Sequence, residues 1–328
     1  MQATTAAATA GPLARTARRQ AWTGAALLAF LLLVAVKAQS GGFDSFEIQT
    51  MLTSTLALGY LTLAQGVIVI GGGIDLSVGA QMVLFNCLSA RLMEGQPFGT
   101  CLLIAAVATA AGGLLGALTG LVIAKSGVPD IIVTLATSFV WSGLALLVMP
   151  TPGGGTALEF QALVLGSGTE FWPPLVGLAV PGLIVWYVLR RTRAGLGVYA
   201  FGSNREAAFL AGVPAARTRI TAYAIGGLLC ALGGLAATAF TAGGDPRATA
   251  GMTATLTSVA AIVLGGIALT GGVGGLLGPV TAVWSLYLIP AIMLARGVDP
   301  AYGEAVKGVV IVLVVLLGGL LRRERKGT

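Results

Sequence analysis

The side chains with the clearest potential for chemistry lie in the stretch VIVIGGGIDLSVGA, residues 67–80, where a carboxylate follows three consecutive glycines in an apolar run. Glycine accepts positive φ and lets other backbone come close, so this triplet predicts a break between two helices. An ionised carboxylate in apolar surroundings costs free energy, which makes it a candidate for a role in gating or in a substrate path. A cap on the following helix is the alternative role. The candidate residues here are Gly71, Gly72, Gly73, Asp75 and Ser77.

Two further sets of polar side chains repeat at helical spacing inside apolar runs. Residues three or four apart share one face of a helix. Hydroxyls, an amide and an aromatic ring on such faces suit a neutral, hydroxyl-rich solute, but Ser and Thr also pack helices together in membranes, so both interpretations stay open. The first set is Ser54, Thr62 and Gln65, and the second is Thr134, Thr137, Ser138 and Trp141.

Other kinds of chemistry have little support in the sequence. The chain has no His and no G-x-S-x-G motif, so we predict no catalytic residue. Its three cysteines, Cys87, Cys101 and Cys230, are scattered through separate runs, which predicts packing rather than a metal site. A G-x-x-x-x-G-K-[ST] phosphate loop is missing as well. Any energy from ATP must therefore come from another chain, and no cofactor is expected in this one.

The elements that must position these residues are membrane-spanning helices. Hydrophobic residues make up 56% of the chain and charged residues only 9%, and about 20 apolar residues cross a bilayer core of about 30 Å. The fold class is therefore an all-α, polytopic membrane protein. We predict one permease-like domain over 21–321, a disordered tail over 1–20 and a basic tail over 322–328. The ten predicted spans are 21–38, 48–70, 76–90, 101–124, 131–149, 174–190, 219–240, 254–270, 276–295 and 304–321.

Basic residues predict the orientation of these spans. With the N-terminus inside, 14 of the 19 Lys and Arg residues fall on the cytoplasmic side, as expected for cytoplasmic loops. The net charge of +7 is thus a topology signal and not a sign of nucleic-acid binding. Both termini are predicted to be cytoplasmic. A cleaved signal peptide ending near 40 remains an alternative, but it would leave nine spans and weaken the charge asymmetry.

Glycine-rich breaks are predicted at two places. The run 76–90 has 15 residues, about 22 Å of helix, so the break before it lies below the membrane surface and faces the protein interior. The stretch LGGIALTGGVGG at 264–275 echoes IGGGIDLSVGA. The echo suggests an internal duplication, because paired interrupted segments are expected at transporter sites. Glycine used only for helix packing is the alternative.

A short cytoplasmic helix is predicted at 204–211. Ser203 and Glu206 form the pattern S-x-x-E of a capping box, while Gly212 and Pro214 stop the helix. Arg205 and Phe209 lie four residues apart and make an exposed charge beside an aromatic anchor, as in protein contacts. An amphipathic helix on lipid headgroups is the alternative, although so small an apolar face binds membranes weakly.

The motif GGIDLSVGA resembles the signature of bacterial ATP-binding-cassette importer permeases of the ribose/xylose/arabinose family. The blocks GLVIAKSGVPDIIVTLAT at 120–137, RTRAGLGVYAFGSNREAAFLAGV at 191–213 and SVAAIVLGGIALTGGVGGLLGPV at 258–280 are similar to later blocks of that family, in order. The resemblance covers about residues 45–320. It implies a bacterial inner-membrane subunit that pairs with a second permease, receives solute from a periplasmic binding protein and is driven by a separate ATPase, which binds ATP and Mg.

The resemblance also assigns roles to residues. It implies that the short helix is a coupling helix for the ATPase, formed by Gly202, Ser203, Asn204, Arg205, Glu206, Ala207, Ala208, Phe209 and Gly212. The chain departs from the family in the eighth predicted span, where Thr255 and Thr257 replace the common Glu and Asp. This loss of charge leaves the solute, and a homodimer as against a heterodimer, undetermined. A monosaccharide is the leading solute class.

A secondary transporter or channel is the alternative function class. It would need its own ion site or selectivity ring, and beyond Asp75 the spans offer only Lys307 and Asp130. A neighbouring gene for an ATPase with a phosphate loop would favour the importer.

Overall fold

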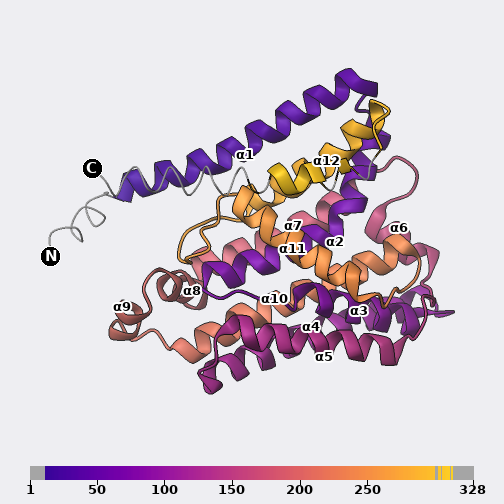
Figure 1. The fold of residues 1–328 in the computed structure, drawn as a ribbon. Helices are drawn as coiled ribbons and strands as arrows, with labels where there is room; N and C mark the ends of the chain where they lie inside the picture. The colour runs from indigo at the N-terminus through magenta and orange to yellow at the C-terminus, as the bar shows by residue number, and fades with distance from the viewer. Residues whose placement is uncertain (1–11, 300–301, 304, 311, 313–328) are drawn as a thin grey trace.

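The computed structural model describes residues 12–299, 302–303, 305–310 and 312, and within this part of the chain the regular structure is helical. One isolated β-bridge joins Gly153 to Gly244. Figure 1 shows most helices side by side, with α8 and α9 at one end and α6 at the other. We call these the α9 end and the α6 end. The helices are α1 Pro12–Gly41, α2 Ser45–Ile70, α3 Val78–Met93, α4 Phe98–Ser126, α5 Asp130–Val148, α6 Leu158–Leu165, α7 Trp172–Arg191, α8 Arg193–Ser203, α9 Arg205–Leu210, α10 Ala215–Thr241, α11 Ala248–Leu264 and α12 Leu277–Ala295.

Seven helices of the described part are long and apolar enough to cross a membrane. They lie in α1, α2, α4, α5, α7, α10 and α12, where spans were predicted. The predicted spans 76–90 and 254–270 correspond to α3 and α11, which have only 16 and 17 residues. The tenth predicted span, 304–321, and the tail 322–328 fall mostly or wholly outside the described residues. A multi-pass membrane protein follows, while the total of ten spans stays a prediction.

The first helix begins earlier than the predicted span 21–38. Residues 12–20, predicted to be disordered, form the first turns of α1. This segment is rich in Arg and Ala, which favour helix, and it continues directly into an apolar span. The remaining residues of the predicted tail, 1–11, lie outside the described part.

The core lies where α2, α3 and α10 meet. Most of α2 is buried, as is much of α10, whereas α4, α5 and α7 turn broad apolar faces outward. In water such faces would drive aggregation, but lipid tails cover them at no cost. The outermost helix, α1, packs on α12, where the Phe30 and Trp284 rings lie 5.7 Å apart.

Helix α4 reaches α10 through glycines four residues apart. A side chain at Gly112 or Gly116 would overlap backbone of Gly227 or Tyr223 in α10. Gly120 meets the same helix one turn further on. This spacing is the small-residue pattern that lets membrane helices approach closely. It fixes α10, which carries several residues of the site below.

The α6 end is held together around Asn86 of α3. Its amide donates to the Thr238 hydroxyl and to the Gly243 carbonyl, both at 3.0 Å, and its oxygen accepts from Asp245 N at 2.9 Å. Arg247 donates hydrogen bonds to the Asp245 carboxylate, which lowers the pKa of that carboxyl below its ordinary value. The loop between α10 and α11 is thereby tied to α3.

Candidate functional site

The predicted break lies between α2 and α3, where residues 71–77 are not helical. Helix α2 ends in a Schellman motif: Gly72 N donates to Val69 O at 2.9 Å and Gly73 N donates to Ile68 O at 3.1 Å. Gly72 has a φ of 76°, a conformation that glycine adopts without strain. The segment is largely buried, so its backbone groups need partners within the protein.

Those partners come from three helices at the α9 end. The hydroxyl of Thr134 in α5 accepts from Leu76 N at 3.1 Å and donates to Ile74 O at 3.3 Å. The Tyr223 hydroxyl of α10 lies 3.5 Å from Ile74 O. Arg205, the first residue of α9, donates to Gly72 O at 3.0 Å. The break is therefore held by α5, α9 and α10 together.

Asp75 is almost fully buried, with 4% of its surface exposed. One carboxylate oxygen accepts from both the backbone N–H and the hydroxyl of Ser77, each at 2.6 Å. Ser77 is the N-cap of α3 but makes no side-chain capping bond. The alternative role of Asp75 as the cap of α3 is therefore wrong. The N-cap position belongs to Ser77, and the Asp75 carboxylate closes a turn just before the helix.

The start of α3 receives its side-chain bond from another helix. The hydroxyl of Thr255 in α11 accepts from Gly79 N at 3.0 Å. A side chain at Gly79 would overlap Gly251 O, so α3 and α11 touch at backbone level. The second threonine named with it, Thr257, is half-buried and bonds the carbonyl of Thr253 in its own helix at 2.8 Å. Thr255 thus bonds the first turn of α3, just after the break, and Thr257 bonds within its own helix.

An ion pair that no sequence pattern predicts lies near the break. Arg219 of α10 lies 3.5 Å from the carboxylate of Asp130, which begins α5. Tyr223 donates to the same carboxylate at 3.3 Å, and Arg219 also donates to Ile123 O at 3.2 Å. In the sequence Arg219 only counted toward the cytoplasmic charge, since a pairing across 89 positions leaves no local pattern. A partner within reach offsets the cost of taking both charges out of water.

The short helix is present, but it begins differently from the prediction. Helix α8 continues through Ser203, and Asn204 is the N-cap of α9, accepting from Ala207 N at 3.0 Å. The predicted capping box of Ser203 with Glu206 is therefore wrong. Gly212 ends the helix as expected, with a φ of 77°. Its N–H donates to Phe209 O at 2.9 Å.

The surface of α9 carries two exposed large apolar side chains beside the exposed Glu206. Phe209 is 72% exposed and Leu210 is 80% exposed. Arg205, expected beside Phe209 as part of the contact surface, turns instead to Gly72 O and places its guanidinium 5.4 Å from the Phe201 ring centre. Arg219 lies 5.6 Å from the same ring. The exposed anchor is thus Phe209 with Leu210, and Arg205 links α9 to the break.

The two predicted sets of polar side chains, in α2 and α5, include residues with a hydrogen-bond partner and residues without one. In α5, Thr137 donates to Thr134 O and Ser138 donates to Leu135 O, which are bonds within the helix. Ser54 in α2 has Tyr287 of α12 as its partner. Apart from the Thr134 hydroxyl, the other polar side-chain atoms of these two sets are buried and have no hydrogen-bond partner within the described residues. They belong to Thr62, Gln65 and Trp141.

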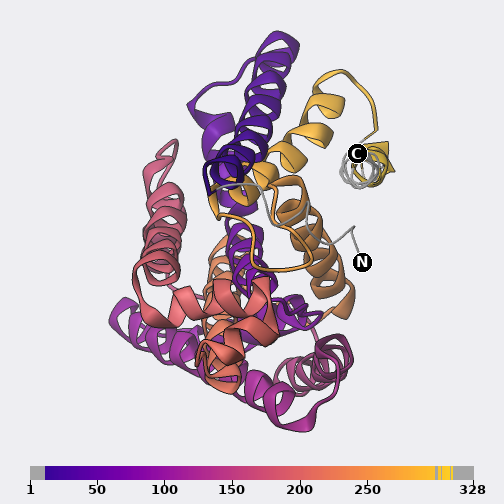
Figure 2. The same ribbon diagram turned by 90° about the vertical axis from the view of Figure 1, so that its left-hand side faces the viewer.

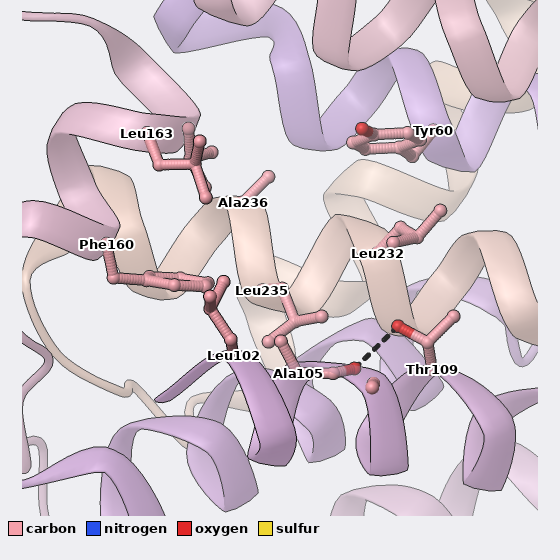
Figure 3. Close-up of a pocket in the computed structure, with 11 residues that line it drawn as sticks. Tyr60, Leu102, Ala105, Thr109, Phe160, Leu163, Leu232, Leu235 and Ala236 are labelled. Carbon is pink, nitrogen blue, oxygen red and sulfur yellow. Dashed lines mark hydrogen bonds between the residues drawn. The ribbon is translucent and has the colours of Figure 1, made fainter. Parts of the chain in front are cut away.

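A cavity of about 380 Å³ lies between α2, α4, α6 and α10. Figure 3 shows that leucine, alanine and phenylalanine side chains dominate its lining. Its two polar side chains are already bonded: Thr109 donates to Ala105 O at 2.8 Å and Tyr60 donates to Gly177 O at 2.5 Å. None of the candidate gating residues lines it. Such a surface suits a lipid chain better than a polar solute.

Comparison with known proteins shows the family to which this chain belongs. Residues 42–315 match the model of the permease component of branched-chain amino acid transport systems. The ribose import permease of Bacillus subtilis is 32% identical over 88% of this chain and 89% of its own length. The fructose import permease of Rhizobium meliloti is 30% identical, covering 89% and 84%. The L-arabinose transporter permease of Azospirillum brasilense is 31% identical, covering 85% and 82%. No solved structure gives a significant match.

Proposed function

Since this chain belongs to the permease-component family of branched-chain amino acid transport systems, we propose that it is the membrane subunit of an ATP-binding-cassette importer for a small polar solute. Permeases named for ribose, fructose and L-arabinose are similar to it along most of their length. All three solutes are neutral and rich in hydroxyl groups, so a monosaccharide is the proposed substrate class. The contact between α9 and the break, made by Arg205 and Gly72, carries this proposal, because it joins a surface helix to an interrupted span.

The partners follow from this role. A separate ATPase, which binds ATP and Mg, docks on α9 through Phe209 and Leu210. A second permease, of the same or a different sequence, completes the membrane part, and a periplasmic binding protein delivers the solute to the α6 end. The broad apolar face of α5, on which Phe139 and Leu147 are strongly exposed, is available to lipid or to that second permease.

The docking role makes α9 the place to test the proposal. Glu206→Ala with Phe209→Ala should reduce recovery of the ATPase with the affinity-tagged permease by about tenfold, because an aromatic anchor in an interface contributes about 2 kcal/mol or more. Membrane insertion should be unchanged. Leu158→Ala is a matched control, since Leu158 is equally exposed at the opposite end, in α6. Equal recovery from the double variant and the control would rule out docking through α9.

We also propose ten spans, with both termini in the cytoplasm of a bacterial cell and the α6 end facing the periplasm. The seven long helices, the shorter α3 and α11, and the apolar segment 304–321 supply the ten spans. The basic residues where α7 ends and α8 begins, Arg190, Arg191 and Arg193, support this orientation.

Cysteine labelling from outside intact cells tests this orientation. A Thr151→Cys variant should react with a membrane-impermeant thiol reagent, whereas an Ala216→Cys variant should react only after permeabilisation. Both positions are exposed: Thr151 lies in the loop that leads to α6, and Ala216 lies in the first turn of α10, shortly after α9. The native cysteines are all buried and give a low background. The reverse pattern would contradict the orientation.

The unsatisfied polar atoms of Thr62, Gln65 and Trp141 are proposed to line the solute path. Leaving a buried polar group without a partner costs about 1–3 kcal/mol. Solute or water can provide those partners in another state of the transport cycle. Asp75 is proposed as the gate of this path, and Thr134 and Thr255 as the residues that position its backbone.

A further inference from the structure

The break after α11 is built in the same way as the break after α2. Gly266 has a φ of 86°, and its N–H donates to Val263 O at 3.0 Å. The next residue, Ile267, donates to Ile262 O at 2.8 Å. This pair of bonds is again a Schellman motif. Both helices therefore stop at the α9 end in one geometry, and each is followed by a glycine-containing segment that leads into the next helix.

The two breaks touch each other directly. Gly272 N, in the segment between α11 and α12, donates to Ile70 O at the end of α2 at 2.8 Å. A side-chain carbon added to Gly271 would lie 2.8 Å from Gly72 Cα. Real side-chain carbons do not come so close to other atoms, so only glycine permits this approach.

The end of α8 closes the same contact from a third side. A side chain at Gly202 would overlap the Ile70 carbonyl and lie 2.7 Å from Gly272 N. Ser203 and Asn204 separate Gly202 from Arg205, which binds Gly72 O. Figure 2 looks onto this end of the molecule and shows the segment between α11 and α12 next to α8 and α9. We call the residues Gly72, Gly202, Gly271 and Gly272 the glycine junction.

We infer that Gly202, Gly271 and Gly272 are positioning residues that join α9 to both breaks, so that a displacement of α9 moves the starts of α3 and α12 together. The inference rests on the proposed docking of an ATPase on α9. The four glycines contact one another and Ile70 through backbone atoms, which leaves little room for a shift, and the Arg205 side chain adds a bond from α9 to Gly72 O. Helix shifts in switching proteins are only about 1–2 Å, and rigid packing is what passes such shifts on.

The variant Gly202→Ala tests the inference in the complex with the ATPase. Its methyl group must push the end of α8 away from Ile70 and Gly272, whereas α9 keeps its own N-cap, Asn204. We expect the ATPase to co-purify and to hydrolyse ATP, while the amount of solute imported per ATP falls by about 5–150-fold, the range of typical coupling between sites. Gly197→Ala is the control, because its methyl group would meet Thr218 and Val213 at an ordinary 3.5 Å.

A distance measurement on otherwise unchanged chains covers the case in which Gly202→Ala fails to fold. Spin labels at Ala211, the C-cap of α9, and at Leu269, both exposed, should keep their separation between the nucleotide-free and ATP-trapped complexes. A label pair at Ala211 and Leu158 should change its separation, since Leu158 lies at the α6 end. A change between Ala211 and Leu269 larger than the about 1–2 Å of a helix shift, or no change between Ala211 and Leu158, would overturn the inference.

The outcomes separate this inference from the proposed function. If the ATPase does not bind the unmodified chain, docking itself is wrong. If the ATPase binds and Gly202→Ala imports as much solute per ATP as Gly197→Ala does, docking stands and the junction does not transmit the movement.

Discussion

Replacing Asp75 with Asn is expected to leave the permease folded and bound to its ATPase but to reduce solute uptake by about tenfold or more, within the range of coupling between sites. An Asn oxygen can still accept both hydrogen bonds from Ser77. The substitution therefore keeps the turn before α3 and removes only the charge and one acceptor atom. A carboxylate at membrane depth costs about 2.5 kcal/mol or more, a cost without purpose if the turn alone were needed.

The measurement is uptake of a labelled monosaccharide into proteoliposomes that contain the permease, its ATPase and its binding protein. Co-purification of the ATPase and the thermal unfolding temperature serve as controls for assembly. Uptake by Asp75→Asn at the rate of the unmodified protein would show that the carboxylate only closes the turn. Loss of assembly together with uptake would point to a structural role.

Replacing Gly116 with Ala is expected to destabilise the whole permease, because the added methyl group would overlap the carbonyl of Tyr223 in α10. Overpacking a core typically costs about 1–3 kcal/mol, and a rigid backbone neighbour places this site at the upper end. The unfolding temperature in detergent and the yield of monodisperse protein should both fall.

Gly113→Ala is the matched control for this variant. Gly113 lies in the same helix, and its added methyl group would meet α10 only at an ordinary 3.7 Å. We expect its unfolding temperature to be near that of the unmodified protein. Equal stability of the two variants would contradict the close approach of α4 to α10. Because Tyr223 also contacts Ile74 and Asp130, the spacing of these helices sets the geometry of the break.

The break at Gly71–Gly73 could be predicted because its signal is local. Three glycines, a carboxylate and a serine follow an apolar run within ten residues, and each has a known backbone preference. The end of α9 could likewise be predicted from Gly212. Its start could not be predicted, since Ser203 and Asn204 are both good N-caps. The fit of Gly202 against Ile70 keeps Ser203 in α8, and that contact spans 132 positions of the sequence.

Long-range contacts explain what else could not be predicted. Thr255 was named for its departure from a family pattern, but its bond to Gly79 depends on α11 lying against α3. The ion pair of Arg219 with Asp130 likewise needs the approach of α10 to the start of α5. The spacing of apolar and polar residues shows which face of a helix is buried, but it does not show which other helix packs against that face.

The packing of α1 against α12 has a consequence for biosynthesis. Roughly 240 residues separate these helices in the chain, so at about 5–20 residues per second the ribosome needs between about 12 and 48 seconds to reach α12 after completing α1. During this interval α1 must reside in the bilayer without the partner that holds Phe30 against Trp284. Its leucines, such as Leu28 and Leu32, remain exposed even in the finished fold, so lipid chains can cover this helix before α12 has been made.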